Sequence, residues 1–243
     1  MQTGEIEAVF TAALPGTRAQ QISAEPEQGR LTLLLTLPQD WHWNTGGGPG
    51  KSVELYVLQG EITLGDVTLL TGNYAYLPPG SLGLTMSTLA GAQVLYFLDE
   101  ADPHAVIRTP LYMSRDVIPW RPLSDDPEDV GLQFKDLRLD PGSGARTWLM
   151  RIAPGATMRW HESASVTEGF LLEGDYRDSE CANGAAVTGD YARGGYFRRP
   201  AGVVSGGPAA GTEEGAVWLL RQPAGGDTTW VDGCLREPSS PET

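Results

Sequence analysis

VELYVLQGE (residues 53–61) and TEGFLLEGD (residues 167–175) are two versions of one pattern, a largely apolar run that ends in a glycine. In each run a glutamate stands six residues before the glycine: Glu54 before Gly60, and Glu168 before Gly174. An apolar run of this length closed by glycine is typical of a β-strand that enters a turn. Side chains alternate across a strand, so we expect Glu54 and Glu168 at equivalent, inward-facing positions.

Three further landmarks recur around these strands in the same order. The segments GNYAYLPPG (72–80) and GGYFRRPAG (194–202) share the spacing G-x5-P-x-G, which predicts a turn, a strand and a second turn. Apolar strands follow at 93–98 and 216–220, and the segments WHWN (41–44) and WHES (160–163) precede the glutamates. Four matched landmarks indicate a duplicated β domain. We expect an N-terminal domain over 1–105, a packed linker over 106–135, a C-terminal domain over 136–233 and a disordered tail over 234–243.

The composition supports an all-β fold and restricts the partners. Of 243 residues, 31 are glycine and 18 proline, which suits short strands and many turns. The net charge of −14 disfavours binding to nucleic acid or to anionic membranes. No signal peptide or membrane-spanning run is recognisable, so a cytoplasmic location is expected. Cys181 and Cys234 form no C-x-x-C motif; we expect two unpaired thiols, and a single disulfide is the alternative.

These landmarks resemble the two motifs of the cupin superfamily, G-x5-H-x-H-x3,4-E-x6-G and G-x5-P-x-G-x2-H-x3-N. Both copies here have five residues, and not six, between the glutamate and the glycine. The resemblance implies two tandem cupin barrels, each a jelly roll (double-stranded β-helix). The segment GLQFKDLR (131–138) adds to this resemblance. Within the superfamily, the chain most resembles the uncharacterised bicupin families related to the ChrR cupin domain.

The resemblance also implies a metal site in each barrel, built from two histidines, a glutamate and a third histidine. Such a set suits Fe, Mn, Ni or Zn. In the second copy these positions correspond to His161, Ser163, Glu168 and Ser205; in the first, to His42, Asn44, Glu54 and Gly83. The chain has three histidines in all, so two full sites cannot form. His161 with Glu168, helped by Ser163 and Ser205, is the better metal candidate, and a metal-free hydrogen bond between His161 and Glu168 is the favoured alternative.

The first copy is a candidate pocket for a polar organic ligand. Its predicted lining is His42, Trp43, Asn44, Glu54 and Tyr56. The glycine-rich loop 44–51 is either a lid over this barrel or a surface loop. In the second copy, strand alternation allows one of Arg198 and Arg199 to point inward, where it could pair with Glu168 or with a ligand carboxylate.

Three functions remain open at this point. The depleted ligand sets favour a small-molecule binding protein. The alternative is a metal-dependent dioxygenase or isomerase acting from the C-terminal barrel. A structural bicupin that forms homodimers is the third. Whether the chain is an enzyme is not decided by its sequence.

Overall fold

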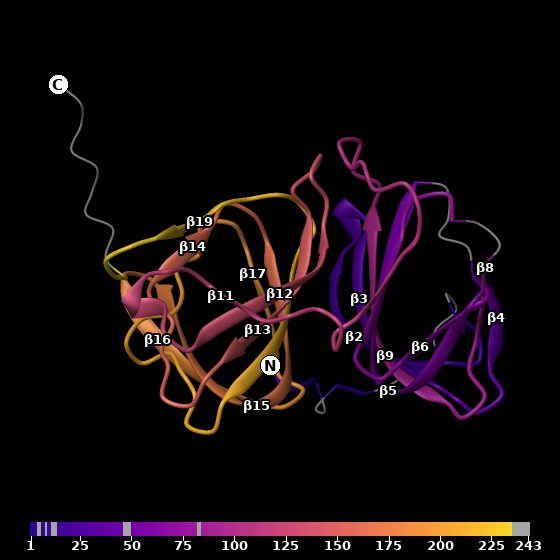
Figure 1. Cartoon of the computed structure of the whole chain (residues 1–243), viewed down its shortest axis with the longest axis horizontal. Helices are drawn as coiled ribbons and strands as arrows, with labels where there is room; N and C mark the ends of the chain where they lie inside the picture. Colours follow the sequence, from indigo (N-terminus) through magenta and orange to yellow (C-terminus); the bar gives the residue numbers. More distant parts are fainter. Residues whose placement is uncertain (4–5, 8, 11–13, 46–49, 82–83, 235–243) are drawn as a thin grey trace. The chain divides into compact units, whose positions relative to one another are not determined.

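The computed structural model describes residues 1–3, 6–7, 9–10, 14–45, 50–81 and 84–234. The chain forms two compact units (Figure 1). We call the unit of residues 3–119 and 137–144 the N-terminal barrel. The C-terminal barrel comprises residues 1–2, 120–136 and the chain from residue 145 onward. The segment 106–135, expected as a linker, is thus divided between the two units.

The N-terminal barrel is built from antiparallel strands, indigo to magenta in Figure 1. Its main sheet has the order β1-β2-β3-β9-β5-β7-β10, and β4, β6 and β8 pair beside it. Its core contains leucine, valine and aromatic side chains from alternate strand positions, among them Leu35, Val53, Leu55 and Tyr96. The elements are β1 (Val9–Phe10), β2 (Arg18–Glu25), η2 (Pro26–Gln28), β3 (Arg30–Leu37), β4 (His42–Thr45), β5 (Lys51–Leu64), β6 (Val67–Leu70), β7 (Asn73–Leu77), β8 (Leu84–Ser87), β9 (Ala92–Glu100) and β10 (Leu111–Ser114).

The C-terminal barrel repeats this arrangement with fewer paired strands. Its main sheet has the order β11-β12-β13-β18-β15-β16, with β17 on β15, and β14 forms a separate pair with β19. Figure 1 shows these strands in rose to yellow. The elements are β11 (Arg121–Pro122), η3 (Pro127–Asp129), β12 (Leu132–Leu139), β13 (Arg146–Ile152), β14 (His161–Ser163), β15 (Thr167–Ala182), β16 (Ala185–Ala192), β17 (Tyr196–Arg199), β18 (Ala216–Gln222) and β19 (Thr228–Trp230).

The two long strands that contain the repeated pattern are irregular at the same place. The register of β5 against β9 shifts between Val57 and Gln59, and that of β15 against β18 shifts between Leu171 and Glu173. Each shift lies just before the repeated glycine. A bulge adds one residue and reverses which parity of residue faces the core. The two copies therefore share a bulge as well as a sequence pattern.

The described helical segments are two short 3-10 turns, and neither could cross a bilayer. The predicted fold class, two tandem all-β barrels, is confirmed. Of the predicted tail 234–243, Cys234 lies in the described chain and residues 235–243 lie outside it.

Candidate functional site

The C-terminal barrel encloses a cavity of about 220 Å³. Its walls are mainly apolar and include three large aromatic side chains of the barrel core, Trp148, Phe197 and Trp218. The Phe197 ring packs directly on Gly169 of the neighbouring strand, where a Cβ atom would lie 2.2 Å from the ring. A glycine at this position therefore lets the aromatic wall lie flat against β15. A cavity with mostly apolar walls and few polar groups is the usual form of a small-molecule site.

The uncharged polar side chains that line this cavity include His161, Ser163, Thr167, Ser205 and Gln222. His161 and Ser205 are adjacent, because their backbone groups exchange two hydrogen bonds of 2.9 Å. The Gln222 amide Nε2 donates to Ser163 Oγ at 2.8 Å and to Thr167 Oγ1 at 3.2 Å. The glutamine therefore orients both hydroxyl groups from strand β18.

His161 is held as a neutral hydrogen-bond acceptor. Its Nδ1 lies 2.9 Å from the backbone oxygen of Arg159, which can only accept, so Nδ1 carries the hydrogen and Nε2 retains a lone pair. Burial of the ring lowers the pKa of His161 below its usual 6.5; the charge of Arg199 lowers it further, while the bond to Arg159 opposes the shift. The ring also meets the edge of Trp230 at 5.7 Å between centroids. At neutral pH, the imidazole thus offers an acceptor and no charge.

Arg199 is the inward member of the Arg198–Arg199 pair. It lines the cavity, forms an ion pair with the buried Asp178, and donates from Nε to Glu180 Oε1 at 2.6 Å. Its guanidinium group also lies 3.8 Å from the centre of the Phe197 ring. Two carboxylates therefore face this one cation, and it does not act as an isolated positive charge.

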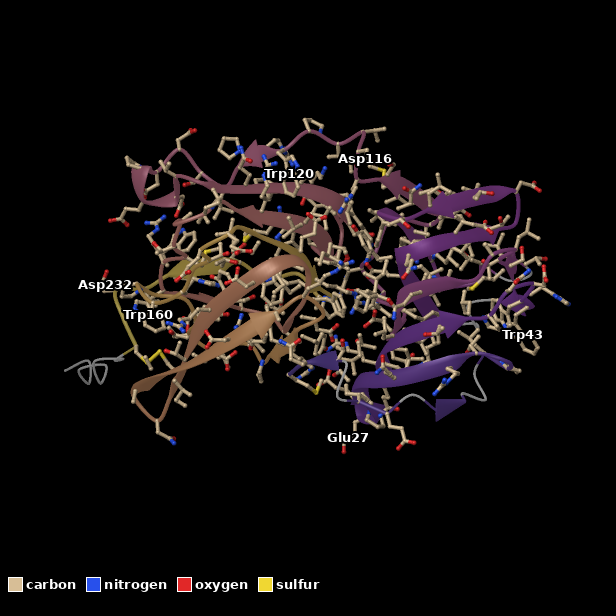
Figure 2. The ribbon with its side chains drawn as sticks, turned by 90° about the horizontal axis from the view of Figure 1, so that it is seen from below. Glu27, Trp43, Asp116, Trp120, Trp160 and Asp232 are labelled. Carbon is tan, nitrogen blue, oxygen red and sulfur yellow. A yellow bond between two sulfur atoms is a disulfide. The ribbon has the colours of Figure 1, made fainter. Side chains whose placement is uncertain are left out.

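One side of the cavity is formed by residues 223–234, which we call the strap. Its strand β19 pairs with β14, opposing Trp230 to His161, and both Thr228 and Trp230 line the cavity. The strap ends at Cys234, which is disulfide-bonded to Cys181 of β15 (yellow bond in Figure 2). The expectation of two unpaired thiols is wrong, because the fold brings two cysteines 53 residues apart in sequence to a Cα separation of 5.3 Å.

Glu168 does not share the cavity with His161. Thr167, Gly169 and Leu171 face the interior of the barrel, and Glu168 points to the opposite face of the sheet. There its carboxylate lies 3.6 Å from the guanidinium group of Arg221, and both side chains are buried. The prediction that Glu168 faces inward is therefore wrong by one position along the strand. Counting the superfamily's six-residue spacing back from Gly174 places its acidic position at Thr167, which does line the cavity.

The predicted inward face of β5 in the N-terminal barrel is also wrong by one residue. Val53 and Leu55 face the core, so Glu54 and Tyr56 lie on the other face of β5. Glu54 is fully buried there: it accepts from Tyr74 Oη at 2.6 Å and from Arg138 Nη1 at 2.9 Å.

His42 and Trp43 are exposed on β4, and Trp43 is labelled in Figure 2. The structure does not bring them together with Glu54 and Tyr56. Three parts of these predictions lie outside the described residues: the side chain of Asn44, residue Gly83, and residues 46–49 of the predicted lid 44–51.

Comparison with known proteins agrees with this architecture. Residues 108–223 match the model of the ChrR cupin-like domain. This match covers just under half of the chain, most of it in the C-terminal barrel. No curated protein matches this chain.

Solved structures similar to this chain include a candidate dioxygenase from Nostoc punctiforme, with 19% identity and a TM-score of 0.72 over 93% of this chain and 82% of that one. Protein Ylba from Escherichia coli is 18% identical, with a TM-score of 0.67 over 91% of this chain and 89% of that one. The W96Y variant of Bacillus subtilis oxalate decarboxylase is 14% identical, with a TM-score of 0.63 over 95% and 78%. At these identities the likeness concerns the fold.

The metal implied by the superfamily does not fit the residues of this cavity. The four corresponding positions hold one imidazole and three hydroxyl groups: His161, Ser163, Thr167 and Ser205. Neutral hydroxyl groups are weak ligands for Fe, Mn, Ni or Zn, which prefer imidazole and carboxylate. Across the described part of the chain, no three His, Cys, Asp or Glu side chains are grouped so as to hold a metal ion.

Two residues of the cavity were missed by sequence reasoning. Thr167 could have been found from the superfamily's six-residue spacing. Gln222 had no motif around it and lies at the end of an apolar strand. Its role depends on the pairing of β18 with β13 and β15, which only the folded barrel shows.

Proposed function

We propose that this bicupin is a binding protein that holds a small organic molecule, without a metal ion, in the cavity of the C-terminal barrel. The observation that supports it most directly is the replacement of three metal-ligand positions by hydroxyl groups in an aromatic cavity. The buried ion pairs of Glu54 with Arg138 and of Glu168 with Arg221 add support, because they leave neither glutamate available as a ligand.

Metal analysis and ligand screening together test this proposal. The protein is incubated with Fe²⁺, Mn²⁺, Ni²⁺ or Zn²⁺, desalted, and analysed by inductively coupled plasma mass spectrometry; we expect far less than one ion per chain. A thermal-shift screen of small aromatic and aliphatic compounds is expected to raise the unfolding midpoint for some of them. The cavity-filling variant Ser205→Leu is expected to lose that response.

One ion per chain that is lost in His161→Ala would contradict the proposal. That result would instead favour a metal-dependent enzyme, in line with the structural similarity to the candidate dioxygenase and to oxalate decarboxylase. His161 is the feature that supports this second candidate.

A further inference from the structure

The hydroxyl groups of the cavity are arranged as hydrogen-bond donors. A hydroxyl group has one hydrogen to donate and two lone pairs that accept. Ser163 Oγ already accepts from Gln222 Nε2 at 2.8 Å and from the Ser165 amide at 3.2 Å, and Thr167 Oγ1 accepts from the same Gln222 nitrogen. Ser163 therefore has only its hydrogen left for a ligand, and Thr167 has its hydrogen and one lone pair. A metal ion requires lone pairs, whereas these two hydroxyl groups can both offer a hydrogen to an oxygen atom.

His161 supplies the complementary acceptor. Its Nδ1 is bonded to the Arg159 carbonyl, so Nε2 can receive a hydrogen from a ligand. A ligand hydroxyl group both donates and accepts, so it matches the His161 acceptor as well as the hydroxyl donors that line the same cavity. A carbonyl oxygen would satisfy only the hydroxyl donors.

The charges around the cavity favour a neutral ligand. Arg199 faces both Asp178 and Glu180, and Arg146, the other cation that lines the cavity, donates to Asp136 at 2.5 Å. Asp136 is shared with Arg121, so three arginines meet three carboxylates around the cavity. The charge of the walls is balanced and does not offset the desolvation of an anion.

The remaining walls suit a flat ring. Trp148, Phe197 and Trp218 line the space, and Trp218 meets Phe197 edge to face at 5.2 Å between centroids. Aromatic side chains bind aromatic rings through stacked and edge contacts. We propose that the cavity binds a neutral aromatic alcohol of the phenol type, with its hydroxyl group between His161 and Thr167 and its ring among these aromatic walls. This inference rests on the proposed function and names the chemical class of its ligand.

Three matched compounds test the class by isothermal titration calorimetry on the full chain: 4-ethylphenol, ethylbenzene, which lacks the hydroxyl group, and 4-ethylbenzoate, which is an anion. We expect 4-ethylphenol to bind with one site per chain and ethylbenzene to bind at least about tenfold more weakly, since it leaves buried polar groups unpaired. We expect 4-ethylbenzoate to bind more weakly than either.

Variants locate the contact. Thr167→Val removes the hydroxyl group at nearly constant volume; it is expected to weaken 4-ethylphenol about tenfold and to leave ethylbenzene unchanged. Thr188→Val makes the same change at an exposed position of β16, outside the cavity, and is expected to alter neither affinity.

Equal affinity for 4-ethylphenol and ethylbenzene, tightest binding of 4-ethylbenzoate, or no binding of 4-ethylphenol would each overturn the phenol class. These results would leave the proposed function in place, because that is judged by the metal content and by the wider screen.

Discussion

The disulfide between Cys181 and Cys234 is expected to contribute a large part of the stability of the C-terminal barrel. It closes a loop of 53 residues that includes β16, β17, β18 and the strap. The chain-entropy model gives a loss of about 14 cal/mol/K for a loop of this length, or about 4 kcal/mol at 25 °C. The double variant Cys181→Ser/Cys234→Ser should therefore unfold with a free energy lower by about 4 kcal/mol.

Urea unfolding followed by tryptophan fluorescence measures this change. Five of the seven tryptophans belong to the C-terminal barrel, so the signal reports mainly on that unit. Wild-type protein treated with dithiothreitol is the matched control: it should fall to the stability of the double variant, whereas the variant should not respond to the reductant. The strap would then be held only by the β14–β19 pairing and the contacts of Trp230, so acrylamide should quench the fluorescence of the variant more strongly.

A difference of less than about 1 kcal/mol between the oxidised wild type and the variant would refute this reasoning. So would equal quenching of the two proteins, since the strap would then be secured without the covalent bond.

Three further predictions concern the buried charges and the missing ligands. Burial disfavours the charged form of the Asp140 carboxylate, but hydrogen bonds from four backbone N–H groups outweigh this effect and lower its pKa to about 2. The ionised carboxylate should contribute roughly 2 kcal/mol of stability above pH 3.8, and this contribution should be lost as the pH falls through about 2. In circular-dichroism melts, Asp140→Asn should therefore reduce the loss of stability at acid pH. Arg138→Met should destabilise the N-terminal barrel by about 3–5 kcal/mol in urea unfolding, because it removes the cation that faces the buried Glu54 carboxylate. Adding Glu54→Leu should recover most of the loss, and equal stability of the two variants would contradict this. A third variant restores the superfamily's absent ligands: Ser163→His, Thr167→Glu and Ser205→His. It should bind Zn²⁺ in calorimetry far more tightly than the same variant with Thr167 retained, whereas equal binding would mean that Glu168 can serve as the ligand.

The face of each strand was the part of the site that could not be predicted from periodicity. Residues 52–57 of β5 and 168–172 of β15 are all buried, so both faces of these strands are covered and apolar residues occupy both. Alternation then says which residues share a face but not which face is the interior. A shift of one residue moves a whole set of side chains to the other face of the sheet. Glu54 and Glu168 therefore lie buried on the outer face of the barrel sheet and not in the interior.

The bulges increase this difficulty. In β15, Thr167 and Leu171 face inward before the bulge, and Tyr176 and Asp178 face inward after it, so the parity of inward residues changes within one strand. No residue type in this sequence marks the extra position, because a bulge is set by how the two paired strands fit each other.

The sequence by itself determined the duplication, the all-β class and the tight turns at the repeated glycines. Gly174, for example, adopts φ 80°, and a Cβ atom there would lie 1.8 Å from the oxygen of Gly215. The turn therefore requires glycine at this position, and the repeated glycine in the sequence marks it. The sequence also identified His161, Ser163 and Ser205, which line the cavity. Only the tertiary structure decided that Thr167 and Gln222 complete the site, that Glu168 does not, and that Cys181 meets Cys234. These facts depend on strand register and on contacts between distant segments, for which neighbouring residues carry no signal.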